Sequence, residues 1–146
     1  CPECQNPQTW SMDDGMKFTD AVFDQLIQYY YDIPYASRLT FSGGDPLANP
    51  ELTYYILLGF KIYFPNKSVW LYTGYQFENI AFNTSLTKKE QLIQKIVRLC
   101  DVIVDGKFEI DKRDISLQFM GSSNQRIIDV PKSLKANEVI CWNESR

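Results

Sequence analysis

Hydrophobic residues recur at helical spacing in three stretches of the chain. The first stretch begins after Thr19, whose hydroxyl suits a helix N-cap, and ends at Ile33-Pro34, because proline disfavours helix in the residue before it. Its apolar positions are expected to share one face of the helix: Ala21, Val22, Leu26, Ile27 and Tyr30.

Two more helices are predicted by the same spacing. Asn49-Pro50-Glu51 opens one of them, with a cap followed by proline at the first helical position, and Pro65-Asn66 ends it. Thr87 and Glu90 form a capping box at the start of the other, and a shorter helix is expected over Phe77–Phe82. The predicted buried stripes are Leu52, Ile56, Leu57, Phe60 and Phe64, then Leu92, Ile93, Ile96, Val97 and Leu99.

Short runs of β-forming residues separate these helices. Strands are predicted over Arg38–Ser42, Ser68–Thr73 and Asp101–Val104, the last as a strand buried on both faces. Ile127–Val130 indicates another short strand, and Glu138–Trp142 an edge strand or a tail. Regular alternation of helix and strand predicts βαβ units, a parallel sheet and a single α/β domain over residues 1–146.

Composition narrows the function. The chain is 45% hydrophobic and 23% charged, as in a globular domain, and its net charge of −3 gives no general attraction to nucleic acid or an anionic membrane. No apolar run is long enough to span a bilayer and no signal peptide is visible. A reducing cytoplasm is expected because the cysteines do not look like a disulfide framework. Histidine is absent, which excludes histidine-based catalysis, so enzymatic chemistry would come from a cofactor and no catalytic side chain is predicted.

The four cysteines do not form a disulfide framework, since a chain of this size folds on its core. Cys100 and Cys141 are expected to pack as small hydrophobic residues. The Cys1-x-x-Cys4 pair is compatible with a thiol-redox motif, half of a zinc site, or part of an iron–sulfur site. The residues after Cys4 break a helix start, which disfavours the thiol-redox interpretation.

Unusual residues follow three of the predicted strands, where parallel sheets bind ligands. The first strand ends in Ser42 and is followed by Gly43, Gly44 and Asp45: the two glycines let a ligand approach the backbone, and the carboxylate suits an ammonium group. The second strand ends in Thr73, and the third is followed by the acid–base pair Asp105 and Lys107. Each signal alone is more often an ordinary turn, but their equivalent positions favour one binding site.

A further polar stretch, Gly121–Arg126, carries the side chains of Asn124, Gln125 and Arg126. By itself such a run is most often a solvated loop. Its density of donors favours a functional role, and the guanidinium of Arg126 could pair with a carboxylate bidentately.

Five blocks, in order, resemble the anaerobic ribonucleoside-triphosphate reductase activating proteins, which are small radical S-adenosylmethionine (SAM) enzymes. That family carries C-x-x-x-C-x-x-C, whose second and third cysteines match Cys1 and Cys4, followed by a sequence close to Gln5–Trp10. The other matching blocks are Thr40–Leu47, Val69–Tyr75, Asp101–Phe108 and Gly121–Asp129.

The resemblance implies a partial (β/α) barrel with a parallel sheet, whose first strand is missing from this chain. It implies a [4Fe–4S] cluster on three cysteines, of which the first would precede Cys1, so that the third cysteine ligand is missing here as well. The cluster would cleave SAM reductively and generate a glycyl radical on the large subunit of anaerobic ribonucleotide reductase. An electron donor such as flavodoxin or ferredoxin is a further implied partner.

By matching position, the resemblance assigns Cys1 and Cys4 to the cluster. It places Ser42, Gly43, Gly44 and Asp45 at the methionyl end of SAM, with Thr73 among the SAM contacts. Asp105 and Lys107 would bind the SAM carboxylate or a cation. Asn124, Gln125 and Arg126 would contact SAM or the glycine loop of the partner.

Alternatives remain open at this point. The chain could activate another glycyl-radical enzyme of the formate-lyase type, or be a degenerate binding domain without a cluster. A zinc or thiol-redox module is a more distant alternative. With only two of three cluster ligands, this 146-residue chain is expected to be an inactive fragment of an active parent.

Overall fold

The computed structural model describes residues 7–9, 11, 15–84 and 86–143. Five α-helices in this part of the chain are α1 (Asp20–Asp32), α2 (Pro50–Tyr63), α3 (Phe77–Ala81), α4 (Lys88–Leu99) and α5 (Val130–Ala136). The strands are β1 (Arg38–Phe41), β2 (Ser68–Tyr72), β3 (Val102–Asp105) and β4 (Arg126–Asp129). Short 3₁₀ helices are η1 (Pro7–Thr9), η2 (Pro46–Ala48) and η3 (Ile110–Lys112). These bounds confirm the three long predicted helices, the short one and all four strands.

The four strands form one sheet in the order β1-β2-β3-β4. β1, β2 and β3 are parallel, as predicted, and all four residues of β3 are buried. β4 runs antiparallel to β3, so the expectation of a wholly parallel sheet was wrong at this strand. The physical reason is the connection: the segment 106–125 carries only η3 and no long helix that would return the chain to the opposite end of the sheet.

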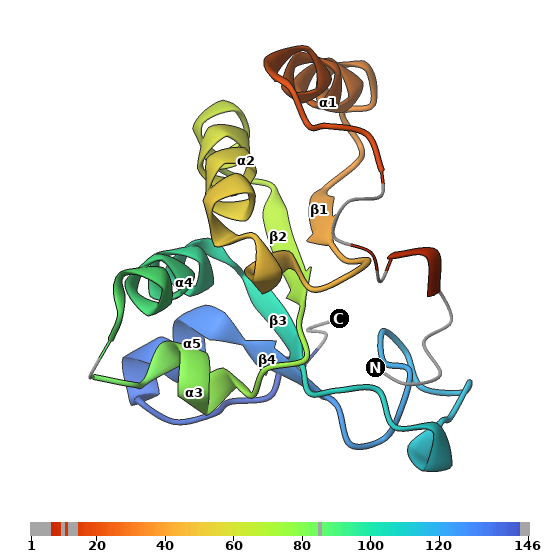
Figure 1. The fold of residues 1–146 in the computed structure, drawn as a ribbon, viewed down its shortest axis with the longest axis vertical. Coiled ribbons are helices and arrows are strands. Elements are labelled where there is room, and N and C mark those ends of the chain that lie inside the picture. The colour runs from red at the N-terminus through yellow and green to blue at the C-terminus, as the bar shows by residue number, and fades with distance from the viewer. Residues whose placement is uncertain (1–6, 10, 12–14, 85, 144–146) are drawn as a thin grey trace.

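Helices cover one face of the sheet, and the segment between β3 and β4 lies on the other side (Figure 1). Side chains alternate accordingly. Val69 and Leu71 belong to the large core under the helices, whereas Trp70 lies in a second cluster with Val102 and Val104 on the opposite face. The described chain therefore presents one face of the sheet covered by helices and an opposite face, which we call the inner face, lined by aromatic and aliphatic side chains.

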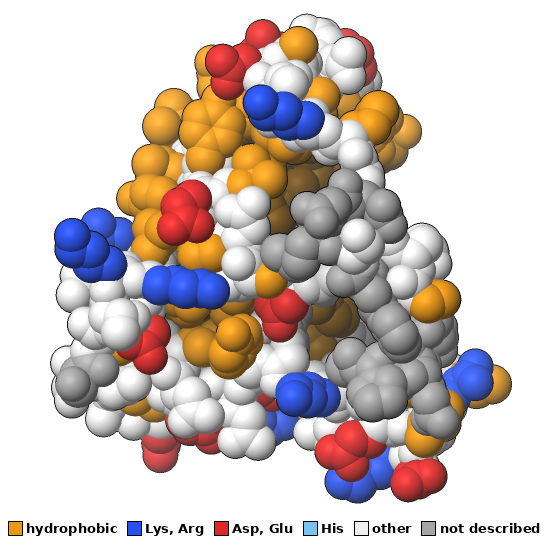
Figure 2. All heavy atoms as spheres, viewed as in Figure 1, with side chains coloured by type: hydrophobic (Ala, Val, Ile, Leu, Met, Phe, Trp, Pro, Cys, Tyr) orange, Lys and Arg blue, Asp and Glu red, His pale blue; other side chains and the backbone are white. Residues whose placement is uncertain are grey.

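Helix α1 packs against α2 through a close approach at Gly59, and hydrophobic side chains gather over these two helices on the face shown in Figure 2. A β-carbon at that position would lie 2.5 Å from the ring of Phe23, which explains a glycine within a helix. Phe23 is buried together with Ile27 and Tyr30, the i, i+4, i+7 row of α1. Ile27 and Tyr30 are buried as predicted, whereas Ala21 is exposed and Phe23, which was not on the predicted face, is buried.

The helix starts agree with their sequence signals. The hydroxyl of Thr19 accepts a hydrogen bond from the amide of Val22, and the side chain of Asn49 accepts one from Leu52. Thr87 and Glu90 form the complete capping box that their spacing predicted. These caps satisfy amides that have no partner within the helix.

The C-terminal part differs from expectation in two places. Val130 begins helix α5, which was not predicted, and does not end a strand. Residues 138–142 form a tail, the second of the two predicted alternatives, and Cys141 makes only an isolated bridge with Ile128. Cys100 is buried as predicted, but Cys141 is exposed, so its predicted packing role was wrong.

No helix among the described residues combines the length and the hydrophobicity that crossing a bilayer requires.

Candidate functional site

The carboxyl ends of β1 and β2 are joined through Asp45. Its carboxylate accepts hydrogen bonds from the hydroxyl of Thr73 (2.9 Å to Oδ2) and from the amide of Gly74 (2.9 Å). It also caps η2 by accepting from the amide of Leu47 at 2.9 Å. The prediction that these strand ends converge is confirmed, but the carboxylate of Asp45 is occupied by the protein itself.

Thr73 is equally engaged. It is 6% exposed, and its hydroxyl accepts a hydrogen bond from the amide of Tyr75 at 3.2 Å while donating to Asp45. Its own amide donates to the carbonyl of Val104 on β3 at 3.0 Å. Thr73 therefore connects three successive strand ends.

The turn that Asp45 holds is open to solvent. Ser42, Gly43 and Gly44 are all exposed. Gly43 has φ of +79°, a conformation that L side chains rarely adopt, and a β-carbon there would meet nothing within 4 Å. Such a turn leaves space in which a ligand can reach the backbone.

The segment that follows the cysteine pair lies beside this turn. A β-carbon at Gly44 would lie 3.6 Å from the carbonyl oxygen of Thr9, the last residue of η1. Cys1 and Cys4, the predicted metal ligands, lie outside the described residues. Within the described part of the chain, no group of three or more cysteine, aspartate or glutamate side chains could hold a metal ion.

Asp105, at the end of β3, is a buried carboxylate paired with the partly exposed guanidinium of Arg126. It is 1% exposed, and both of its oxygens accept from Arg126: Oδ1 from Nε at 3.0 Å and Oδ2 from a terminal nitrogen at 2.5 Å. Oδ2 also accepts from the amide of Phe77, at 2.8 Å, so that Asp105 holds the start of α3. Asp105 is thus paired with Arg126 and not with Lys107.

A second carboxylate completes this network. Glu78 accepts two hydrogen bonds from Arg126, at 2.9 and 2.7 Å, so the guanidinium binds two carboxylates at once. These bonds hold the pKa of Glu78 below its ordinary value and raise that of Arg126. The bidentate pairing predicted for Arg126 is present, but its carboxylates come from the chain itself.

The polar stretch before β4 folds back onto the end of β3. The side chain of Gln125 accepts from the amide of Gly121 at 2.8 Å and donates to the carbonyl of Gly106 at 2.9 Å. Asn124 donates to the carbonyl of Lys107 at 2.8 Å. Its amide oxygen Oδ1 is buried with no hydrogen-bond partner in the structure, which is costly unless a ligand or a water supplies a donor.

Unused polar groups are therefore few. Among the described residues, the ammonium of Lys107 has no ion-pair or hydrogen-bond partner, and its alkyl chain packs against Gly74, 3.3 Å from where a β-carbon would be. At this edge the described residues leave without a partner the ammonium of Lys107 and the Oδ1 atom of Asn124, near the exposed turn at Ser42–Gly44. Asp45, Thr73, Asp105, Gln125 and Arg126 build the frame that holds it.

Sequence reasoning missed Glu78. It lies 48 residues from Arg126 and belongs to a five-residue helix, so no local pattern pointed to it. An unpaired glutamate in the first turn of a helix is common, and only the tertiary structure brings this one to the guanidinium.

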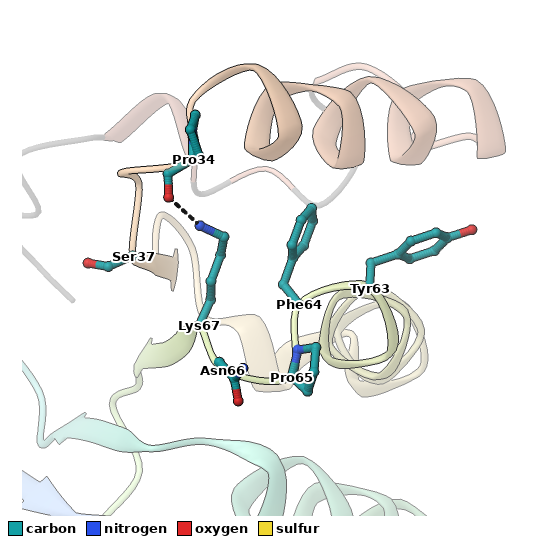
Figure 3. A pocket seen from close by; sticks show the side chains of 7 residues that line it. All are labelled: Pro34, Ser37, Tyr63, Phe64, Pro65, Asn66 and Lys67. Atoms are coloured by element: carbon teal, nitrogen blue, oxygen red, sulfur yellow. Dashed lines mark hydrogen bonds between the residues drawn. The ribbon is translucent and has the colours of Figure 1, made fainter.

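A cavity of about 340 Å³ lies elsewhere, at the amino ends of β1 and β2 (Figure 3). Its lining includes Pro34, Ser37, Phe64 and Lys67. The ammonium of Lys67 donates to the carbonyls of Pro34 and Ala36, at 3.0 and 2.5 Å, and so ties two connections together. The ammonium of Lys67 therefore already has hydrogen-bond partners, and the cavity lies at the opposite end of the strands from Asp45 and Thr73. For these two reasons we assign the cavity no role in the site.

Comparison with known proteins places these features in a family. Residues 1–128 match the family described as "4Fe-4S single cluster domain". The chain is 35% identical over 128 residues to the anaerobic ribonucleoside-triphosphate reductase-activating protein of Escherichia coli (strain K12), covering 86% of this chain and 77% of that relative. Proteins of the same name from Vibrio cholerae serotype O1 (34% identity; 87% and 78% covered) and Enterobacteria phage T4 (36%; 87% and 74%) are also similar.

This chain belongs to the family of anaerobic ribonucleoside-triphosphate reductase-activating proteins. No solved structure matches it significantly.

Proposed function

We propose that this protein activates anaerobic ribonucleoside-triphosphate reductase by generating a glycyl radical on the large subunit of that enzyme. It does so as a radical SAM oxidoreductase that holds a [4Fe–4S] cluster and binds SAM. The observation that carries the proposal is its membership of a family whose relatives bear this name, over 86% of the chain. Activation of a formate-lyase type of enzyme, and a cluster-free binding role, are not favoured by these relatives or by the family description.

The cluster is assigned to Cys1 and Cys4 as two of its ligands, because thiolates are the usual ligands of iron–sulfur clusters. Cys4 precedes Thr9 by five residues, a length of chain that spans at most about 18 Å. Thr9 lies against Gly44, so this reach includes the open turn at the end of β1. Cys100 is buried and its thiol pKa is raised by burial, which argues against a thiolate ligand there.

SAM is assigned to the same edge of the sheet. When bound, the cluster supplies the electron that cleaves SAM, from which abstraction of a glycine hydrogen on the reductase follows. Backbone groups of Ser42, Gly43 and Gly44 receive the methionyl end, and Asp45 and Thr73 fix the shape of that turn from behind. Lys107 offers a cation to the SAM carboxylate, and the Oδ1 atom of Asn124 offers an acceptor to a SAM donor.

The remaining assignments concern the barrel fold, the cellular location and the electron donor. Three parallel strands with helices on one face support a partial (β/α) barrel, with the inner face of the sheet turned toward the reaction. We place the protein in the cytoplasm, where thiols remain reduced, with a flavodoxin or ferredoxin as electron donor.

Anaerobic reconstitution of the full-length protein tests the proposal. Wild-type protein is expected to bind iron and sulfide, to cleave SAM when reduced, and to produce the glycyl-radical EPR signal on the cognate large subunit. Cys1→Ser and Cys4→Ser should abolish all three results, while Cys141→Ser, at an exposed cysteine, should retain them.

Two outcomes contradict the proposal. A full-length protein that holds no iron would indicate the cluster-free binding domain. A signal that forms on a formate lyase and not on the reductase would indicate the other activase class.

A further inference from the structure

The inner face of the sheet carries a cluster of one cation and three rings, which we call the Arg38 cluster: Arg38, Trp70, Phe119 and Trp142. The Arg38 guanidinium lies 4.3 Å from the centre of the Trp70 ring and 5.1 Å from that of Phe119. Trp70 and Trp142 meet edge to face at 5.0 Å. The cluster joins the first strand of the sheet to the segment before β4 and to the C-terminal segment.

Arg38 differs from those cations of the described chain that form ion pairs. Arg126 and Lys61 are neutralised by acidic side chains. Among the described residues, Arg38 has no carboxylate partner, and its side chain is exposed. A guanidinium that stacks on rings uses its flat faces and keeps its N–H edge free for an in-plane bidentate bond.

Phe119 reaches its place in the Arg38 cluster through a strained backbone conformation. Phe119 has φ of +62°, one of two non-glycine residues with positive φ in the described chain. A bulky residue in this conformation is unusual and costs free energy that the surrounding contacts must offset. Here the strained residue places its ring 5.0 Å from Trp70, beside the guanidinium, and remains 36% exposed.

From these observations we propose that Arg38 binds a carboxylate side chain of the large reductase subunit, with Phe119 and Trp142 as the apolar surround. The inference rests on the proposed function and adds a residue that selects the protein partner. Arginine and aromatic side chains in one partly exposed cluster are the composition that dominates binding energy at protein interfaces. The free N–H edge supplies the charge that an acidic side chain complements.

The carboxylate of SAM is the competing source of an anion, and position argues against it. Arg38 begins β1, whereas the open turn assigned to SAM begins at Ser42, four residues on, or about 13 Å along a strand. Lys107, without a partner among the described residues, lies beside Gly74 at that end of the sheet. The position of Arg38 therefore favours a carboxylate of the partner over that of SAM.

Binding of the full-length protein to the cognate large subunit tests the inference. Arg38→Gln should weaken this binding about 10- to 100-fold, the range expected for a hydrogen-bonded charge pair, and should flatten its dependence on salt. The affinity of Arg38→Lys for the large subunit should lie between those of the wild type and Arg38→Gln, because lysine keeps the charge but cannot form the planar bidentate pair. Arg98→Gln, which removes an exposed arginine of α4, is the matched control and should bind as the wild type does.

SAM cleavage in the absence of the partner separates the possible failures. Arg38→Gln is expected to cleave SAM at the wild-type rate and to melt as a folded protein. If Arg38→Gln binds the large subunit as tightly as Arg98→Gln, or loses SAM binding while keeping partner binding, the inference is overturned. If the wild type itself cleaves no SAM, it is the proposed function that fails. Acidic residues of the large subunit can also be replaced one at a time with the corresponding amides. One of these replacements should weaken binding to the wild type but leave binding to Arg38→Gln unchanged.

Discussion

The hydroxyl of Thr73 donates to the carboxylate of Asp45 across the ends of two parallel strands, with Oγ1 2.9 Å from Oδ2. The two residues are 28 positions apart in sequence. Through this bond and those from Leu47 and Gly74, one carboxylate fixes the turn after β1 relative to β2. The residue that looked most like a ligand for a substrate ammonium is thus the residue that shapes the turn.

Asp45→Asn should lower the free energy of unfolding by about 1–3 kcal/mol, because the amide turns a donor toward groups that themselves donate. Urea denaturation measures this change. Asp111→Asn is the control, since Asp111 is exposed in η3 and its replacement should change stability by less than about 0.5 kcal/mol. Equal stability of the two variants would contradict the role assigned to Asp45.

The two glycines of the open turn should respond differently to alanine. Gly43→Ala is expected to cost about 1–2 kcal/mol of stability, because its φ of +79° strains any L side chain. Gly44→Ala meets only an ordinary contact with Thr9 and should leave stability nearly unchanged, while weakening SAM binding by filling the approach to the backbone. Denaturation and equilibrium dialysis of SAM measure the two effects. A Gly44→Ala protein that binds SAM normally would argue against the proposed cradle.

Arg126→Gln should lower stability by about 3–5 kcal/mol, because it leaves the Asp105 carboxylate, 1% exposed, without a counter-charge. Adding Asp105→Asn should restore part of the loss, since the buried charge is then removed as well. Denaturation of the two single variants and the double variant gives the coupling energy. If the stability losses of the two single variants simply add in the double variant, the interaction between Asp105 and Arg126 contributes little to stability.

Glu78 should make the protein sensitive to acid. Its folded pKa lies below the ordinary 4.5 because of Arg126, so its contribution to stability is present above that pH and is lost as the pH falls through the folded value. The wild type is expected to lose stability more steeply than Glu78→Gln below about pH 4.5. Denaturation at a series of pH values measures the slopes, and parallel slopes would exclude this contribution.

Asn124 and Gln125 are neighbours whose replacement should affect SAM binding differently, although each donates a hydrogen bond to a backbone carbonyl. Gln125→Ala removes bonds to Gly121 and Gly106 and should chiefly lower stability, by about 1–2 kcal/mol. Asn124→Ala removes the bond to Lys107 together with a buried oxygen that has no partner, so it should lower stability as well as weaken SAM binding about 10-fold, the missing donor being supplied by SAM. Thermal melting and SAM affinity, measured on both variants, distinguish the roles. The assignment fails if Asn124→Ala binds SAM as the wild type does.

Local sequence signals located most elements of the fold. The caps at Thr19, Asn49 and Thr87 act within three residues along the chain, so they are readable without any tertiary contact. The continuous apolar run of β3 likewise predicted its burial. The α1 face was misjudged because the large side chain of Phe23 packs at Gly59, a contact with another helix.

The partners within the site could not be read in this way. Sequence placed Asp45 and Thr73 at neighbouring strand ends, because parallel strands bring their carboxyl ends to one edge. It did not show that the two residues bond to each other and not to a ligand. Asp105 and Arg126 were both singled out as binding groups, yet their partnership depends on β4 running antiparallel, which sets them opposite one another in the sheet.

By itself, the sequence determined the order of helices and strands, the absence of histidine, the cysteine pair and the polar strand ends, because each is written in residues near one another. Only the tertiary structure decided which polar groups remain available. A donor or acceptor that is already bonded within the protein is less available to a ligand. Long-range hydrogen bonds engage the side chains of Asp45, Thr73, Asp105, Gln125 and Arg126 in this way. Among the described residues, the groups left without a partner include the ammonium of Lys107, the Oδ1 atom of Asn124 and the N–H edge of Arg38.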